Sequence, residues 1–333
     1  DLARRGLTSM LRHFEMFGKE LPGIGGFEGW GGTLYTLTNM GVLWDDSAVL
    51  DQAGEVVDIL ADFIEQDDVY GVMRGAAGAI AALLSFHQCE PSAKALDVAT
   101  ACGDHLLASA KVMERGLGWA PPGSSSVPLT GFAHGAAGIA WALLALYEAT
   151  GERGYRVAAQ QAIAYERSLF MPEVGNWPDL RPGDLGNGSA VSGSPRYPVA
   201  WCHGAAGIGL SRLSALSILL DRELHNEIRT ALNTTITRGF GQTHCLCHGD
   251  MGNLELLLEA ARVLNEEKWR LEAQRFGSRI IESIDRHGWY CGGPGGVELS
   301  GLMLGTAGIG YQMLRLAEPE RVPSLLTLAP PTG

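Results

Sequence analysis

Two short segments of the chain place metal-ligating side chains directly ahead of a turn of small residues. They are Trp201-Cys202-His203-Gly204 and Cys247-His248-Gly249-Asp250. Zinc binds thiolate sulfur at about 2.3 Å and imidazole nitrogen at about 2.0 Å, and a site with three protein ligands keeps a fourth position open for substrate. One Cys followed much later by an adjacent Cys and His differs from the two close pairs of a structural finger. The pattern is typical of a catalytic zinc held by Cys202, Cys247 and His248, although spacing alone leaves a metal-free interpretation equally open.

A metal at these residues would act through the acidity of thiols. A free cysteine has a pKa of about 8.5 and is only a few per cent thiolate at neutral pH, whereas a thiol that coordinates zinc is deprotonated outright. A fourth, incoming thiol would therefore become a ready nucleophile.

The elements that position these residues are predicted from a repeat. The chain has 45 glycines, many of them in a recurring unit, Gly-x-x-Gly followed by an apolar stretch. Self-similarity of this kind is typical of a repeat architecture. The copies begin at Gly29, Gly75, Gly135, Gly204, Gly249 and Gly305.

The stretches after the glycine pairs are apolar almost all round, as in residues 136–147, and a helix of that kind must be buried. The stretches between them, such as residues 221–233, are amphipathic. Inner helices thus alternate with outer ones, which predicts an all-α fold: an α/α toroid, a double ring of helical hairpins whose inner helices begin at the Gly-x-x-Gly motifs. For copies without Cys or His, close helix packing alone explains the small residues.

In such a ring His134, Cys202-His203 and Cys247-His248 occupy the same place, immediately before the first glycine of their units. The toroid would bring them together at one mouth, where helix N-termini contribute free N–H groups and positive partial charge. A lone His ahead of a helix is more often a polar cap than a catalyst, but three equivalent places favour a shared site.

Other cysteines and histidines are weaker candidates. Cys245 and Cys291 are rival ligands, whereas Cys89 and Cys102 lie away from the glycine motifs and are interpreted as inert. The histidines outside the shared place are interpreted as surface or core residues: His13, His87, His105, His225, His244 and His287.

Composition excludes several classes of protein. The 333 residues are 46% hydrophobic and 19% charged, and 25 basic against 37 acidic residues give a net charge of −12, which argues against a nucleic-acid partner. No apolar run reaches the roughly 18 residues of a membrane span, and the start has no signal-peptide core, so we expect a cytoplasmic protein without a membrane span. Six cysteines are too few for a disulfide scaffold.

One long loop interrupts the repeats. Residues 171–198 are rich in Gly, Pro, Ser and Asn, carry Trp177 and Asp179, and lead directly to Cys202. Loops of this length are usually functional or disordered, and we expect this one to cover substrate. We expect a single domain over residues 1–333, with residues 319–333 as a loose C-terminal tail.

The ordered motifs resemble the lanthipeptide cyclase family, the LanC-like proteins, and in particular the C-terminal cyclase domain of class II lanthipeptide synthetases of the LanM type. The resemblance runs from about Gly25 to the C-terminus. Its motifs are Gly131-Phe132-Ala133-His134-Gly135, the two cysteine segments with Asn253, and the ending from Gly301-Leu302-Met303 to Leu314-Arg315-Leu316.

This resemblance implies an α/α toroid with one Zn2+ held by Cys202, Cys247 and His248. The ion would activate a cysteine thiol of a dehydrated precursor peptide, which adds to dehydroalanine or dehydrobutyrine and forms a lanthionine or methyllanthionine ring. His134 matches the family's acid/base histidine, and His203 is a second candidate for proton transfer or enolate stabilisation. The resemblance also implies a dehydratase, either as another part of the same enzyme from which this domain is excised or as a separate protein.

One position departs from the family pattern. The second repeat usually has an Asp four residues ahead of its first glycine, where this chain has Gly71; Asp67 and Asp68 lie nearby but out of register. We expect zinc and His134 to suffice for slower or altered cyclisation, and Gly71→Asp to raise the rate.

Three hypotheses remain open at this point. The leading one is a zinc-dependent peptide cyclase. The second is a LanC-like enzyme that adds glutathione or another small thiol to dehydrated residues. The third is a non-catalytic, zinc-stabilised peptide-binding domain. The protein prenyltransferases are also zinc-dependent toroids, but they use an Asp, Cys and His ligand set and lack these glycine motifs.

Overall fold

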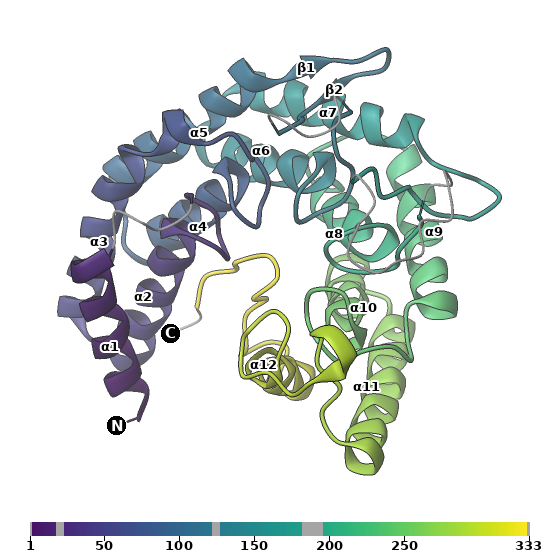
Figure 1. Ribbon diagram of the computed structural model, residues 1–333. Helices are drawn as coiled ribbons and strands as arrows, with labels where there is room; N and C mark the ends of the chain where they lie inside the picture. Colours follow the sequence, from purple (N-terminus) through teal and green to yellow (C-terminus); the bar gives the residue numbers. More distant parts are fainter. Residues whose placement is uncertain (1, 18–22, 122–126, 182–195, 332–333) are drawn as a thin grey trace.

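The structure is a computed structural model that describes residues 2–17, 23–121, 127–181 and 196–331. These residues form two concentric layers of helices around a common centre (Figure 1). The inner layer consists of α2 (Trp30–Trp44), α4 (Ala76–Cys89), α6 (Ala136–Thr150), α8 (Ala205–Ala215), α10 (Asp250–Leu264) and α12 (Thr306–Ala317). The outer layer consists of α3 (Ser47–Ala61), α5 (Ala93–Ser109), α7 (Arg153–Ser168), α9 (Glu223–Arg238) and α11 (Glu267–His287).

Each inner helix from α2 to α10 packs against the outer helix that follows it and against the next inner helix of the ring. The difference between the layers follows from the sequence: α6 is buried along most of its length, whereas α11 buries one stripe that includes Trp269, Phe276 and Ile280. The predicted α/α toroid is therefore confirmed.

Smaller elements complete the chain. Helix α1 (Leu2–Phe17) precedes the ring, and two 3-10 turns, η2 (Ile64–Gln66) and η3 (Pro294–Gly296), lie in connections. The strands β1 (Lys111–Val112) and β2 (Leu117–Gly118) form a short antiparallel hairpin that the sequence patterns did not indicate. No helix in the described residues combines the length and apolar character needed to cross a bilayer.

All six predicted helix starts are found where the glycine motifs put them. The residue immediately before each inner helix is the first glycine of its motif: Gly29, Gly75, Gly135, Gly204, Gly249 and Gly305. The second glycine serves a close approach. A Cβ at Gly138 would lie 1.9 Å from the Phe132 carbonyl oxygen, and one at Gly207 would lie 1.9 Å from that of Trp201. The motif therefore lets each preceding loop fold tightly against its own helix.

The loops at this end of the ring are joined to one another by backbone hydrogen bonds. The amide of one loop donates to a carbonyl of the next: Gly26 to Val72 (3.0 Å), Met73 to Ala133 (2.9 Å), Phe132 and Ala133 to Cys202 (3.1 Å each), Cys202 to Cys247 (3.2 Å) and Cys247 to Met303 (2.9 Å). Because this chain of bonds passes through the loops that carry the cysteines and His134, residues far apart in sequence are held at one mouth.

A buried ionic network supports the same end of the ring. Arg212 on α8 is fully buried and donates to Glu166 on α7 (2.9 Å) and to Glu227 on α9 (2.5 Å). The second carboxylate oxygen of Glu166 accepts the Gly131 amide at 2.8 Å. Burial raises the pKa of the Glu166 carboxyl, and the Arg212 charge opposes that rise. The network thus fixes the start of the loop that leads to His134.

The expectation of a loose tail at residues 319–333 is wrong for its described part, residues 319–331. Leu325, Leu326 and Leu328 are buried, and the Tyr35 hydroxyl on α2 donates to the Ala329 carbonyl at 2.8 Å. Residues 332–333 lie outside the described residues. The apolar leucines explain the difference, because a tail that buries them gains hydrophobic stabilisation.

Candidate active site

The two cysteines of the sequence motifs lie together. Cys202 precedes α8 and Cys247 precedes α10, and the Cys202 amide donates to the Cys247 carbonyl at 3.2 Å. The interaction between the two side chains lowers the pKa of the Cys202 thiol and raises that of Cys247. The pair is largely buried. Two thiols from neighbouring repeats therefore meet at the mouth of the ring, as their equivalent positions in the repeats predict.

His248 lies beside this pair and its imidazole hydrogen-bonds to the Cys245 thiol. That bond raises the pKa of His248. Burial opposes ionisation of Cys245, but the bonds from His248 and Thr243 outweigh it and lower the pKa of that thiol. In the part of the chain that the structure describes, no three His, Cys, Asp or Glu side chains are arranged as a metal-binding group.

Cys291, the other rival ligand, is directed elsewhere. Its buried thiol donates to the Leu299 carbonyl at 3.8 Å. The next residue, Gly292, lies directly over the site, because a Cβ there would be 2.6 Å from the Cys245 sulfur and 3.1 Å from His248 Nε2. The backbone around Gly292 therefore covers the Cys245–His248 pair.

The two candidate acid/base residues form a stacked pair. The rings of His134 and His203 have centroids 5.6 Å apart and an interplanar angle of 24°. Burial, followed by the charges of Arg181 and Arg74, lowers the pKa of His134 to about 4. Burial and Arg181 lower the pKa of His203 to about 3. Both imidazoles are therefore uncharged at neutral pH.

The long loop brings a carboxylate to these rings. Asp179 is buried, and its Oδ1 lies 3.9 Å from His203 Nδ1. Arg181 holds the same carboxylate through Nε (3.0 Å) and Nη2 (2.7 Å). Burial alone would raise the pKa of Asp179, but the hydrogen bonds and the charge of Arg181 bring it down to about 2. Residues 182–195, the middle of the predicted covering loop, lie outside the described residues.

The sequence analysis did not identify Arg181 as a site residue. Its charge acts on His134 and His203 and also on the thiols of Cys202 and Cys247. The available signal was its two-residue spacing from Asp179 in a loop that runs to the first cysteine.

Gly71 lies against the backbone of the catalytic candidate. A Cβ at this position would be 2.7 Å from the Ala133 carbonyl oxygen and 2.8 Å from His134 Cα. These contacts argue against the expectation that Gly71→Asp raises the rate, and on steric grounds we now expect it to lower the rate. The neighbouring Asp67 does not replace it, since its carboxylate accepts the amides of Val69 (3.0 Å) and Ala76 (2.8 Å) at the start of α4.

The histidines and cysteines that the sequence analysis interpreted as inert, surface or core residues are either bonded within the fold, buried or exposed. His87, His105 and His244 contact Ser92, the Asp67 carbonyl and Ser283 respectively, and His225 and His287 are exposed. The side chain of His13, on α1, lies outside the described part. Cys102 is buried in α5, and Cys89 is half-buried at the end of α4.

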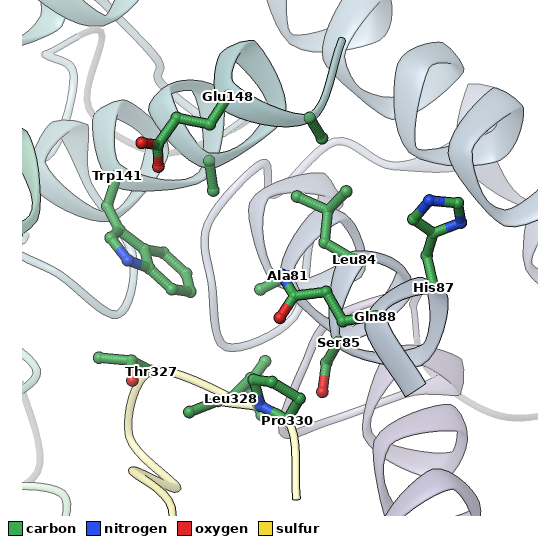
Figure 2. A pocket seen from close by; sticks show the side chains of 13 residues that line it. Ala81, Leu84, Ser85, His87, Gln88, Trp141, Glu148, Thr327, Leu328 and Pro330 are labelled. Carbon is green, nitrogen blue, oxygen red and sulfur yellow. The ribbon is translucent and has the colours of Figure 1, made fainter. Parts of the chain in front are cut away.

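A cavity of about 360 Å³ lies between α4, α6 and the tail, where Gln88 and Trp141 face Thr327 and Leu328 (Figure 2). None of the predicted site residues lines it.

Comparison with known proteins identifies relatives of the chain. The family model described as lanthionine synthetase C-like protein matches residues 1–327. The lacticin 481/lactococcin biosynthesis protein LcnDR2 of Lactococcus lactis subsp. lactis is 26% identical over 199 residues, which cover 56% of this chain and 20% of that protein. The matched part thus spans about a fifth of the length of that curated relative.

Solved structures share the fold. Nisin cyclase superposes with a TM-score of 0.75 at 18% identity, over 98% of this chain and 84% of that one. Cellobiose 2-epimerase from Spirochaeta thermophila superposes with a TM-score of 0.55 at 16% identity, over 86% of this chain and 85% of that one. Because a protein described as a cyclase and one described as an epimerase share this architecture, the fold alone does not assign an activity.

Proposed function

Because the chain belongs to the lanthionine synthetase C-like family, we propose that it is a lanthionine cyclase. In this proposal a cysteine thiol of a dehydrated precursor peptide adds to dehydroalanine or dehydrobutyrine and closes a thioether ring. The observation that carries the proposal is the meeting of the Cys202–Cys247 thiol pair with two uncharged imidazoles and an arginine at one mouth. This set combines sulfur chemistry with proton transfer.

The donor types of Cys202, Cys247 and His248 suit one zinc ion, although in their present positions in the described residues they do not surround a common point. Two thiols and an imidazole are the soft set that zinc binds in catalytic sites. The thiols of Cys202 and Cys247 already face each other, and the charge of His248 acts on the Cys202 sulfur. To join them, His248 would have to give up its interaction with Cys245. When bound, zinc would deprotonate the incoming peptide thiol and hold it near the ligands.

His134 is proposed to carry the proton. Its imidazole is uncharged at neutral pH because its pKa is about 4, so its resting form accepts a proton. In the addition the sulfur electron pair forms the C–S bond at Cβ, and the π pair moves toward the carbonyl oxygen as an enolate. The imidazolium then returns the thiol's proton to Cα.

The aromatic side chains below the site exclude water. Trp201 is buried and packs against Phe27 (centroids 5.3 Å apart) and Phe132 (5.7 Å). A dry floor strengthens electrostatic interactions at the mouth and protects an enolate from solvent protons.

The test is to incubate the purified protein with a dehydrated, cysteine-containing peptide, with and without a zinc chelator. Cyclisation leaves the peptide mass unchanged and removes one free thiol per ring, so alkylation followed by mass spectrometry counts the rings. We expect loss of thiols with zinc and none with chelator. Persistence of every free thiol in the zinc-loaded reaction would contradict the proposal.

The same assay separates the other hypotheses. With glutathione present, an added-thiol mass on the peptide would identify an intermolecular thiol transferase. Peptide affinity without turnover would identify a binding domain. A dehydratase, which must supply the substrate of this reaction, is proposed as the partner, as another part of a longer enzyme or as a separate protein.

A further inference from the structure

We propose that Asp179 and Arg181 work as a pair in this site: Asp179 positions His203 and Arg181, and Arg181 binds the carbonyl oxygen of the dehydrated residue as it becomes an enolate. This inference rests on the proposed cyclase function and names the groups that act on the substrate's acyl side. It also explains how the chain provides a carboxylate although position 71 is glycine.

The backbone around Asp179 is firmly held. The Asp179 amide donates to the Arg196 carbonyl at 2.8 Å, and the Thr130 hydroxyl donates to the Pro178 carbonyl. Trp177 is buried beside them. Because Thr130 belongs to the loop that leads to His134, the position of Asp179 is tied to that of the imidazole pair.

His203 has a free place for this carboxylate. The ring is fully buried, and neither of its nitrogens has a side-chain hydrogen-bond partner; the Thr130 backbone is the polar group that acts on it besides Asp179 and Arg181. The Asp179 oxygen lies 3.9 Å from Nδ1 and would accept from Nδ1–H after an approach of about 1 Å, and such bonds are often long before substrate binds. The absence of a side chain at Gly131 leaves room beside this nitrogen, since a Cβ there would lie 3.0 Å from His203 Nδ1. An accepted Nδ1–H fixes the tautomer and leaves Nε2 as the free base.

Arg181 has donors to spare. A guanidinium carries five N–H groups, and the bonds to Asp179 use only Nε and Nη2. The side chain is 42% exposed, so a peptide can reach it. The guanidinium binds the same carboxylate that lies 3.9 Å from His203 Nδ1, which puts it beside the imidazole pair. A permanently charged donor that is already oriented stabilises an oxyanion without reorganisation.

The roles are then divided between the two edges of the substrate. The thiol side faces Cys202, Cys247 and His248, where the C–S bond forms at Cβ. The carbonyl side faces Arg181, which receives the electron pair displaced from the double bond. His134 completes the addition by protonating Cα.

The test compares Arg181→Met, Arg181→Lys and Asp179→Asn with wild type in the thiol-counting assay. We expect Arg181→Met to lower kcat about 100- to 1000-fold, as for loss of an oxyanion donor, with KM changed less than about threefold. Arg181→Lys keeps the charge and should recover part of the rate. Arg238→Met is the matched control: its exposed guanidinium donates to the Val174 carbonyl near the start of the same loop and contacts none of the proposed site residues, so kcat should stay within about threefold.

Asp179 is tested by a readout that does not need turnover. The 15N shifts of the His203 ring should report the Nδ1–H tautomer in wild type and a tautomer mixture in Asp179→Asn. An Arg181→Met enzyme with unchanged kcat, or an unchanged His203 tautomer in Asp179→Asn, would overturn the inference. Failure of the proposed function is distinct: wild type itself would then leave the thiols of the dehydrated peptide free.

Discussion

Replacing Gly71 by alanine perturbs the site through a single methyl group. The new Cβ would lie 2.7 Å from the Ala133 carbonyl oxygen and 2.8 Å from His134 Cα. Carbon atoms in contact prefer about 3.5–4.0 Å, so the His134 backbone must move by about 1 Å. Both atoms are backbone, and the Ala133 carbonyl also accepts the Met73 amide, so no flexible side chain can absorb the shift.

The expected cost has two parts. Overpacking of this kind destabilises a fold by about 1–3 kcal/mol. A displacement of about 1 Å in a catalytic group lowers kcat about 100-fold. We therefore expect Gly71→Ala to fold with a reduced Tm and to close rings about 100 times more slowly, and we expect Gly71→Asp to be worse.

Gly54 on α3 provides the control, because a Cβ there meets nothing within 4 Å. Gly54→Ala should stabilise the helix by about 0.4–1 kcal/mol and leave the rate unchanged. Tm by calorimetry and rates by thiol alkylation are measured for all three variants. If Gly71→Ala or Gly71→Asp cyclises as fast as wild type, the steric reasoning is refuted.

Three further predictions follow from the buried groups. The folded-state pKa of His134, about 4, lies below the ordinary 6.5, so the unfolded chain binds a proton at a higher pH than the folded chain does. About 2–3 kcal/mol of stability is therefore lost as the pH falls from about 7 to about 4.5. His134→Gln should remove that loss in denaturant titrations. Arg212→Met leaves the Glu166 carboxylate buried without its partner and should cost about 3–5 kcal/mol of unfolding free energy in urea titrations. Gly292→Ala presses on His248 and should weaken zinc binding about 10- to 100-fold in competition titrations with a chromophoric chelator.

Each of these has a control or an opposing outcome. A parallel stability loss in His134→Gln and wild type would contradict the pH argument. Arg286→Met, which breaks an exposed pair with Glu282, should cause no measurable change, and an Arg212→Met variant as stable as Arg286→Met would contradict the network. Gly301, where a Cβ meets nothing within 4 Å, is the control for Gly292, and equal zinc affinities would contradict that prediction.

The ring architecture could be predicted from sequence because its signal repeats. Each Gly-x-x-Gly motif marks a helix start, and the first glycine of each motif is the residue before an inner helix. The convergence of Cys202 with Cys247 follows from the same repeat, since equivalent positions in a ring share one end.

Other features depend on contacts that no local pattern encodes. Arg181 could not be predicted, because its role depends on its bonds to Asp179 and on the 3.9 Å distance between that carboxylate and His203. The steric role of Gly71 depends on a neighbouring repeat, since the atoms it would meet belong to Ala133 and His134. The expectation of a loose tail was wrong because it relied on the Pro and Gly residues at the end of the chain. The leucines that precede them are buried and hold the tail in place.

The central claim is that Cys202, Cys247 and His248 hold one zinc ion with a position open for sulfur. X-ray absorption of the zinc-loaded protein, with metal content measured on the same sample, tests it most directly. We predict one zinc per chain, two sulfur ligands at about 2.3 Å and a nitrogen ligand at about 2.0 Å, with a third sulfur added by a peptide thiol and one lost in Cys202→Ala. A protein that closes rings without metal, or a zinc shell unchanged in Cys202→Ala, would contradict it.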